Sequence, residues 1–197
     1  GESVTASEIL VATGRVPRTG DLGLEAVGLE PGAWLDVDDT LRVRGSAWLY
    51  GVGDVTHRAL LTHQGKYQAR AAGDVIAVRA HGGEVDDAPW GAHVATADHD
   101  AVPQVVFTAP EVAAVGLTAA QAEERGIRAR ALDVDLAQIA GASTRAAHYR
   151  GQARAVVDED RGVLVGATFV GEDAAEMLHA ATIAVVGEVP LHRLWHA

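Results

Sequence analysis

AWLYGVGDVTHRALLTHQGKYQAR, residues 47–70, is the stretch that decides the interpretation of this chain. Trp48–Val52 is apolar and predicts a short buried strand. Gly51 and Gly53 allow the backbone to turn where side chains would collide. Asp54 then falls at the carboxyl end of the strand, the edge at which open α/β sheets bind their ligands. This order predicts a ligand-binding turn.

A helix is expected directly after this turn. Thr62 is the expected N-cap, and Gly82 and Gly83 are the expected stop. The apolar face of this helix is predicted at Ala69, Ala72, Ile76 and Ala80. Free N–H groups at a helix start attract an anion or a polarised carbonyl. The turn and the helix start together therefore favour a cofactor site over simple packing.

At these residues the chain resembles the class I pyridine nucleotide-disulfide oxidoreductases, FAD enzymes that include dihydrolipoamide dehydrogenase, glutathione reductase and mercuric reductase. YGVGDV followed by ALLTHQGKYQAR is similar to the second flavin motif of that family in order and spacing. ILVATGRVPRT, residues 9–19, is similar to an upstream family segment, with Arg18 where Asn is common. Residues 102–118 and 165–185 resemble the opening of the dimerisation domain and its later strand and helix.

The resemblance implies a flavin site at the turn and the helix start. In the family, the residue equivalent to Asp54, which follows Gly53, hydrogen-bonds the ribityl chain of FAD. The helix start at Leu61, Thr62 and His63 points its N–H groups at the flavin, where they stabilise the negative charge of the reduced ring. Without the resemblance, an Asp after Gly at a strand end is most often a plain turn residue.

The resemblance also places Gly14 and Arg15 near the nicotinamide nucleotide, NAD(P)H. A strand-terminating glycine and a solvated arginine remain an equal alternative for these two residues. His192 and His196 are four residues apart, but without a third ligand they are expected at the surface and not in a zinc site. The pattern predicts no metal site.

Several parts that the resemblance implies for a complete family member are missing from the sequence. The chain has no cysteine, and Gly51 and Gly53 are followed by Thr56 where a third glycine of a Gly-x-Gly-x-x-Gly turn would stand. The family's His-Pro-Thr motif, which carries the catalytic base, is also absent. We therefore expect the C-terminal portion of a larger flavoenzyme, without a catalytic residue of its own.

Composition limits the partners of the chain. Among 197 residues, 48% are hydrophobic and 22% are charged, which is typical of a folded globular protein. The 16 basic and 27 acidic residues give a net charge of −11, which repels nucleic acids and anionic membranes. The sequence contains neither a long apolar run nor a basic start followed by an apolar stretch, so neither a membrane span nor a signal peptide is expected. A cytoplasmic location is the default expectation.

The first half predicts an α/β organisation. Glu2–Thr13 is expected to be the closing strand of a nucleotide-binding domain. Leu24–Gly32 is expected to be a short helical or turn segment, and Leu35–Val43 an exposed strand with alternating apolar positions. Glycines, acidic residues and Pro89 break the periodicity after His81, which indicates a domain junction.

The second half reads as strands followed by helices, an α+β layer. Strands are predicted at Gln104–Phe107, Ala113–Leu117, Ile127–Val134, Ala153–Val157 and Val163–Phe169. Thr118 and Gln121 form a predicted capping box, and Gly126 ends that helix. Asp173 is expected to cap a later helix, and Pro190 to open another.

We therefore expect a Rossmann-type FAD/NAD(P)-binding fragment followed by an α+β dimerisation domain. Residues 1–85 are expected to hold the end of the NAD(P)-binding domain and the second segment of the FAD-binding domain, 86–100 the junction, and 101–197 the dimerisation domain. By resemblance the whole enzyme is a homodimer that passes hydride from NAD(P)H through FAD to a disulfide or another acceptor. The alternative is a dimerisation or interaction module without catalytic activity of its own.

Overall fold

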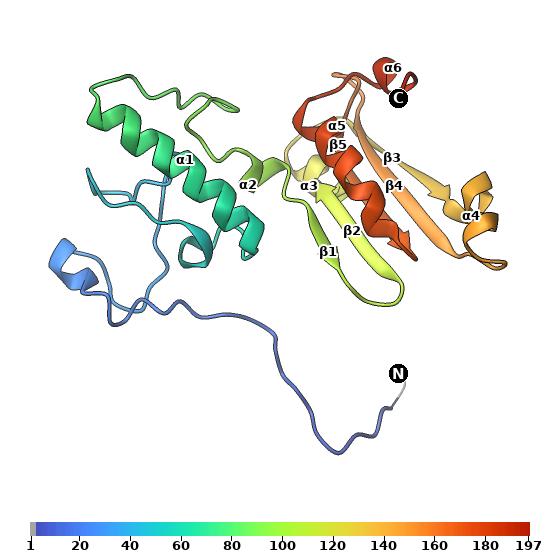
Figure 1. Cartoon of the computed structure of the whole chain (residues 1–197), viewed down its shortest axis with the longest axis horizontal. Coiled ribbons are helices and arrows are strands. Elements are labelled where there is room, and N and C mark those ends of the chain that lie inside the picture. Colours follow the sequence, from blue (N-terminus) through green and yellow to red (C-terminus); the bar gives the residue numbers. More distant parts are fainter. Residues whose placement is uncertain (1–2) are drawn as a thin grey trace.

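The computed structural model describes residues 3–197, so Gly1 and Glu2 lie outside the described part. Figure 1 shows two lobes that meet at the short helix α2 (Ala97–Asp100). The first lobe contains one long helix and much irregular chain, and the second contains an antiparallel sheet. In the described chain no helix is both long and apolar enough to cross a membrane.

The regular elements of the first lobe are all helical. They are the 3-10 helices η1 (Leu24–Val27) and η2 (Gly53–Thr56) and the helix α1 (Thr62–Ala80). Across residues 3–100 the backbone pairs only through isolated bridges, so the parallel sheet of a Rossmann-type fragment is not formed there. One core cluster holds this lobe together, and its buried members are Leu24, Leu35, Val37, Leu41, Val43, Ala71, Ala72 and Ala95.

The exposed strand expected over Leu35–Val43 is instead a buried turn. The Asp38 carboxylate accepts hydrogen bonds from the backbone N–H and hydroxyl of Thr40 and from the N–H of Arg42. Leu41 adopts φ 65° at this turn, and Val37 pairs with Val43 in a single bridge. The side-chain oxygen of Asp38 therefore holds the chain in a turn, and the alternating apolar residues all pack inward.

The strand expected over Trp48–Val52 is also wrong. Tyr50 makes one isolated bridge to Arg42, and Trp48 is exposed. A strand needs a neighbour along its length to satisfy its backbone groups. In the described chain this segment has only scattered backbone bonds to residues 41–43: the Gly51 N–H donates to the Leu41 carbonyl, and the Leu49 carbonyl accepts from the Val43 N–H. Gly51 is tightly packed in this segment, since a Cβ there would meet the side chains of Leu35 and Val37 at 3.2 and 3.3 Å.

Helix α1 begins one residue earlier than predicted and buries a different face. Thr62 is its first residue, Leu61 is the N-cap and makes no side-chain capping bond, and the helix ends at Ala80, before Gly82 and Gly83. Its buried residues are Gln64, Gln68, Ala71, Ala72 and Val75, whereas Ile76 is exposed. The apolar residues alone do not predict the buried face, because Gln64 and Gln68 are buried against a polar partner, Asp98, which is described below.

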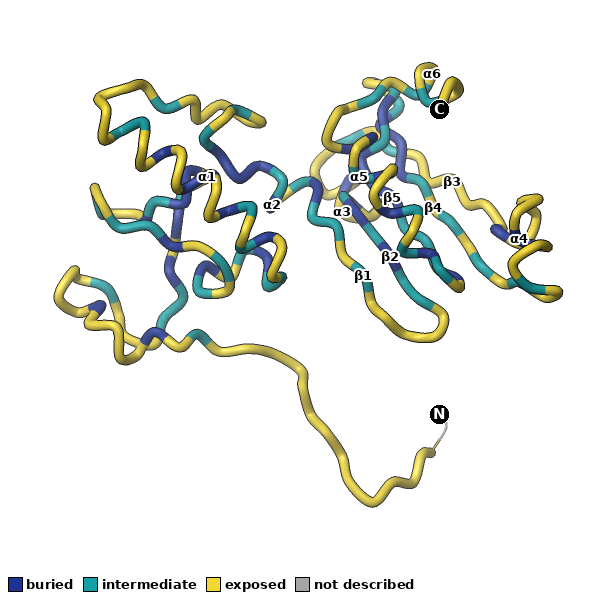
Figure 2. Tube along the Cα trace, viewed as in Figure 1, coloured by how far each residue is buried: buried dark blue, intermediate teal, exposed yellow. Residues whose placement is uncertain are grey.

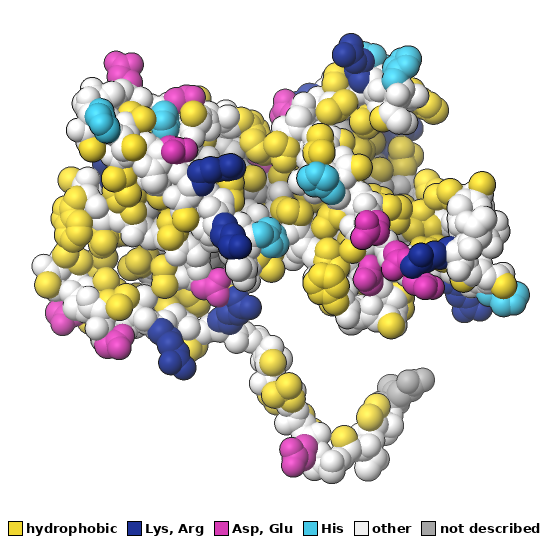
Figure 3. Space-filling view, in the orientation of Figure 1, with side chains coloured by type: hydrophobic (Ala, Val, Ile, Leu, Met, Phe, Trp, Pro, Cys, Tyr) yellow, Lys and Arg dark blue, Asp and Glu magenta, His cyan; other side chains and the backbone are white. Residues whose placement is uncertain are grey.

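The closing strand expected over Glu2–Thr13 is not formed in the described residues 3–13. This segment runs away from both lobes and is exposed along its length, as Figure 2 shows. Figure 3 shows apolar side chains along it, and Ile9, Leu10 and Val11 are among the exposed ones. It is strand-like in sequence, but residues 3–197 place no strand beside it to pair with.

The second lobe is a five-stranded antiparallel sheet in the order β1-β2-β5-β4-β3. Its strands are β1 (Gln104–Val106), β2 (Glu111–Gly116), β3 (Ala129–Asp135), β4 (Gly151–Asp158) and β5 (Val163–Gly171). All five predicted strands are confirmed, with shifted ends. Gly116 (φ 78°) lies opposite Gly166 in the paired strands β2 and β5, and the backbones are so close there that a Cβ on Gly166 would lie 1.9 Å from the Leu117 carbonyl oxygen.

Helices cover one face of this sheet. Helix α5 (Leu178–Val186) packs on β2 and β5 through a cluster of Ala101, Ala113, Val115, Ala167, Leu178, Ala181 and Val185. Helix α3 (Ala119–Glu124) starts with the predicted capping box of Thr118 and Gln121, and Gly126 follows it at φ 71°. The remaining elements are η3 (Leu136–Gln138), α4 (Ala140–Arg145), η4 (Ala174–Met177) and α6 (Leu191–Leu194).

Two predicted helix starts need correction. Asp173 precedes η4 at φ 55° and makes no side-chain capping bond, because its carboxylate pairs with Arg145 instead. Pro190 is the N-cap of α6 and not its first residue. The antiparallel α+β architecture of the second half is confirmed.

Candidate cofactor site

The turn at Gly53 lies against the first turn of α1. Gly53 has φ 74°, a conformation that favours glycine, and it opens η2. A Cβ on Gly65 would lie 3.3 Å from the Cα of Gly53, so the two glycines permit a close backbone approach. The N–H of Gly53 donates to the side-chain oxygen Oε1 of Gln68 at 2.6 Å. The turn and the helix are therefore in direct contact.

Arg15 joins the carboxylate of this turn to the segment that leads into α1. Its Nη1 donates to Asp54 Oδ2 at 2.7 Å and to the Leu60 carbonyl oxygen at 2.9 Å. Both Arg15 and Asp54 keep about half of their side-chain surface exposed, 55% and 51%. The structure thus brings together Arg15, which sequence reasoning assigned to a nucleotide, and Asp54, which it assigned to a flavin.

The start of α1 presents free donors. The N–H groups of Thr62, His63 and Gln64 take part in no hydrogen bond within residues 3–197, as expected for the first turn of a helix. The N–H of Leu61 donates to the Ala59 carbonyl, and the Leu61 carbonyl accepts from Gly65. These unpaired donors and the helix dipole favour an acceptor with negative charge.

Two predicted site residues lie apart from this arrangement. Gly14 is exposed, and a Cβ added there would have nothing within 4 Å. His63 belongs to the helix start, but its ring Nε2 lies 2.8 Å from the Pro103 carbonyl oxygen, at the base of the second lobe. A role for Gly14 at a nucleotide, and for the His63 ring at a flavin, stays a prediction.

Sequence reasoning missed a buried carboxylate beside this site. Asp98 of α2 has a fully buried side chain, and its two oxygens accept from Gln64 Nε2 at 3.0 Å and Gln68 Nε2 at 2.8 Å. Arg58 Nε lies 3.3 Å from Asp98 Oδ2, close enough for an ion pair but not aligned for a hydrogen bond. Burial raises the pKa of Asp98, against the opposing effect of the two amides and Arg58.

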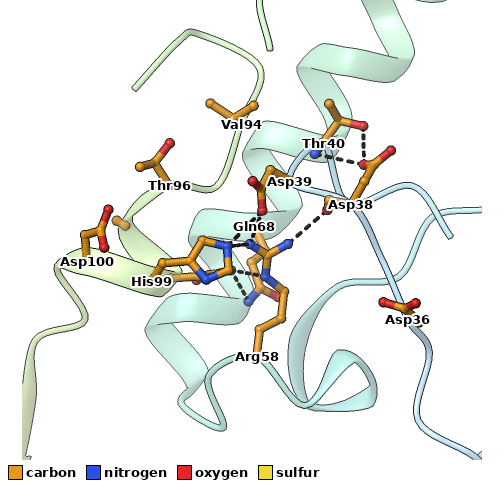
Figure 4. Close-up of polar contacts among 12 residues, drawn as sticks. Asp36, Asp38, Asp39, Thr40, Arg58, Gln68, Val94, Thr96, His99 and Asp100 are labelled. Carbon is orange, nitrogen blue, oxygen red and sulfur yellow. Dashed lines mark hydrogen bonds and ion pairs between the residues drawn. The ribbon is translucent and has the colours of Figure 1, made fainter. Parts of the chain in front are cut away.

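The outer side of this cluster is exposed and carries a second acid. Figure 4 shows Arg58 between Asp39, His99 and Gln68. Arg58 Nη2 donates to Asp39 Oδ1 at 2.6 Å, and His99 Nε2 lies 2.8 Å from the same oxygen. The hydrogen bond with His99, followed by that with Arg58, lowers the pKa of Asp39 although partial burial opposes it. Arg58, its two carboxylate neighbours Asp39 and Asp98, and the His99 ring thus form a polar cluster at the junction.

One sequence signal pointed to this cluster. Gln64 and Gln68 are four residues apart, which places them on one helix face, and that face begins next to the Gly53 turn. Their partner Asp98 lies 34 and 30 residues further along in the sequence, so only the fold reveals the contact.

A surface cavity of about 630 Å³ lies in the second lobe, away from the turn. Its lining residues are Thr108, Ala109, Pro110, Glu111, Ala146, His148, Tyr149, Arg150, Glu172 and Asp173. None of the predicted site residues lines it.

Comparison with known proteins agrees with this architecture. Residues 102–197 match the family described as pyridine nucleotide-disulphide oxidoreductase, dimerisation domain. The chain belongs to this family of oxidoreductases. The match covers the second lobe, from the end of the junction to the last residue.

Curated relatives extend the similarity across the first lobe. The chain is 34% identical to the mercuric reductase of Streptomyces lividans over 99% of its length, and 32% identical to the glutathione reductase of Burkholderia cepacia over 94%. It is 33% identical to the dihydrolipoyl dehydrogenase of Halobacterium salinarum over 90%. It spans 39%, 38% and 35% of the lengths of these relatives.

Two solved structures have a similar fold. LpdA from Mycobacterium tuberculosis superposes with a TM-score of 0.72 at 26% identity, over 92% of this chain and 37% of that one. The flavoprotein disulfide reductase RclA from Escherichia coli superposes with a TM-score of 0.69 at 25% identity, over 91% of this chain and 38% of that one. The similarity therefore includes the first lobe, whose described residues form no regular sheet.

Proposed function

We propose that this chain is the C-terminal part of an FAD-dependent pyridine nucleotide-disulfide oxidoreductase. Such an enzyme passes hydride from NAD(P)H through the flavin to a disulfide or another acceptor. Within the chain, residues 1–85 contribute the end of the NAD(P)-binding domain and the second segment of the FAD-binding domain. Residues 86–100 form the junction and 101–197 the dimerisation domain. The proposal includes a homodimer in the cytoplasm.

The observation that carries the proposal is the contact of the acidic turn with the start of α1. Arg15 holds Asp54 Oδ2 and the Leu60 carbonyl on one guanidinium nitrogen, at 2.7 and 2.9 Å. An acceptor for hydroxyl groups and a set of free backbone donors therefore lie near each other. A single ligand with both hydroxyls and carbonyl oxygens would use both.

The donor set fits FAD. Asp54 Oδ1 has no hydrogen-bond partner in the described chain, so it remains free to accept from a ribityl hydroxyl. The amides of Thr62 and His63 are free to donate to flavin oxygens. When bound, the flavin supplies the hydride-accepting ring, and the helix dipole favours its reduced, anionic form.

The dimer is supported by the surface of α5. This helix, LHAATIAVV, is apolar apart from His179 and Thr182, as expected for a helix covered on more than one face. One face packs on the sheet, while Ile183 and Val186 on the other side are exposed. Phe107, after β1, is exposed as well. Apolar side chains in such positions are typical of a protein interface.

The alternative is an interaction module that dimerises without taking part in redox chemistry. The same exposed side of α5 favours it as strongly as it favours the enzyme. Visible absorbance distinguishes the enzyme from the interaction module, since flavin bound in the whole protein absorbs visible light and a module without flavin does not. The Asp54 contact favours the enzyme.

We expect Asp54→Ala, made in the whole protein, to lower the FAD retained after purification. A ribityl hydroxyl would lose its acceptor, at a cost of about 1 to 3 kcal/mol. The ratio of flavin absorbance to protein absorbance measures the loss. Asp36→Ala is the matched control, because Asp36 is also an exposed acid paired with an arginine, Arg44. Equal flavin content in both variants would count against the flavin site.

A further inference from the structure

A chain of two hydrogen bonds connects the Gly53 turn to the buried Asp98. The N–H of Gly53 donates to Gln68 Oε1 at 2.6 Å, and Gln68 Nε2 donates to Asp98 Oδ2 at 2.8 Å. Gln68 is completely buried. Its amide has one oxygen, which accepts, and one nitrogen, which donates, so only one orientation satisfies both neighbours. In the flipped orientation its oxygen would face a carboxylate and its NH₂ group an N–H.

Asp98 is itself fixed, so it determines which way Gln68 points. Its Oδ1 accepts from Gln64 Nε2 at 3.0 Å, and its Oδ2 is shared by Gln68 and Arg58. Arg58 is held in turn by the Asp38 carbonyl, which accepts from Nη1 at 2.9 Å. A carboxylate without exposed surface and with both oxygens occupied has little freedom to rotate.

Both backbone polar groups of Gly53 are occupied in the turn. Its N–H donates to Gln68, and its carbonyl accepts from the Thr56 hydroxyl at 2.9 Å. Asp54 is the next residue, so the direction of its carboxylate depends on the backbone that these two bonds hold. Gln68 contacts this backbone but is not in hydrogen-bonding contact with Asp54.

We propose that Gln68, oriented by Asp98, is a positioning residue for the Gly53–Asp54 turn and so for the flavin that the turn would hold. The inference rests on the proposed function. It also connects the turn to the dimerisation domain, because the residues after Asp98 contact that domain. Arg125 donates to the Asp100 carboxylate and to the His99 carbonyl. Contacts therefore run from the dimerisation domain through α2 and Gln68 to the Gly53–Asp54 turn.

The first test is made on the 197-residue chain. Gln68→Met keeps the length of the side chain and removes both hydrogen bonds. We expect the Gly53 amide to exchange with deuterium roughly tenfold faster, while amides in β4 and β5 exchange as before. Gln138→Met is the control, because Gln138 is an exposed glutamine in η3. An unchanged Gly53 amide, or equal acceleration at every amide, would overturn the inference.

Gln68→Glu supplies a readout that a packing role would not change. Its carboxylate can still accept from Gly53, but its second oxygen faces Asp98, so near neutral pH two carboxylates repel each other. As the pH falls, the pair takes up a proton, and the contact with Gly53 returns. Gly53 exchange, compared with the wild type at each pH, should therefore be fast near neutrality and normal in acid. The absence of this recovery contradicts the inference.

The last arm uses the whole protein and its flavin content. Gln68→Met should lower retained FAD, as Asp54→Ala does. If Asp54→Ala loses flavin while Gln68→Met retains it, the positioning role is wrong and the flavin site stands. If neither variant changes the flavin content, the proposed function fails together with the inference.

Discussion

Asp39 shows how the junction cluster depends on pH at the level of a single residue. The hydrogen bond with His99 and the bond and charge of Arg58 lower its pKa, so the carboxylate is more stable in the folded chain than in the unfolded one. Its stabilisation is present above the ordinary pKa of about 3.9 and is lost as the pH falls through the lower folded value. Asp98 has the opposite sign, because burial raises its pKa and its charged form costs stability.

We expect Asp39→Asn to lower the free energy of unfolding near neutral pH. The loss should stay within about 1 kcal/mol, because more than half of the Asp39 side chain is exposed and solvent screens the pair. The difference from the wild type should fade as the pH falls below about 4. Urea unfolding at several pH values measures it, with Asp74→Asn on the exposed side of α1 as control. A difference that persists in acid would contradict the assignment.

At the residue level, the turn could be predicted from the sequence, but the buried residues that hold it could not. A glycine pair and an acid in a familiar order predict a turn at Gly53 and Asp54, and in the structure Gly53 lies against α1 while Asp54 pairs with Arg15. Asp98 was missed because a buried acid has no local signature. Its partners are defined by the packing of α2 against α1, which no sequence window spans.

At the level of elements, the two lobes differed in how far local signals determined them. Each strand of the second lobe has a neighbour within the chain, so alternating apolar residues became paired strands. The capping box at Thr118 formed as predicted, since all its groups lie within four residues. The strands expected in the first lobe have no such neighbours in the described chain, and side-chain bonds such as those of Asp38 formed turns instead.

Two glycines of α1 give a matched pair of predictions. Gly73→Ala should raise the free energy of unfolding by about 0.5 to 1 kcal/mol, because a Cβ there meets nothing within 4 Å and alanine favours a helix. Gly65→Ala should give no such gain, because its Cβ would lie 3.3 Å from the Gly53 Cα. Thermal or urea unfolding of both variants checks this. Equal gains would mean that α1 and the turn are not in close contact.

At the level of the whole molecule, the proposed dimer would use the exposed side of α5. We expect Ile183→Glu to shift the protein from dimer to monomer, because a charge would be buried in an apolar contact. Analytical ultracentrifugation measures the shift. Ile76→Glu is the control, since Ile76 is a similarly exposed isoleucine on α1, outside the dimerisation domain. A monomeric wild type, or dissociation of both variants alike, would refute this interface.

The extended segment that precedes Gly14 has a practical consequence for handling the protein. ILVAT, residues 9–13, combines β-branched and aliphatic side chains without proline or charge, the composition of segments that assemble into cross-β fibrils. Its backbone groups are available to any copy that meets it in solution. In a concentrated preparation of these 197 residues, aggregation would begin at this segment. The sheet of the second lobe, whose central strands are paired on both sides, would stay folded.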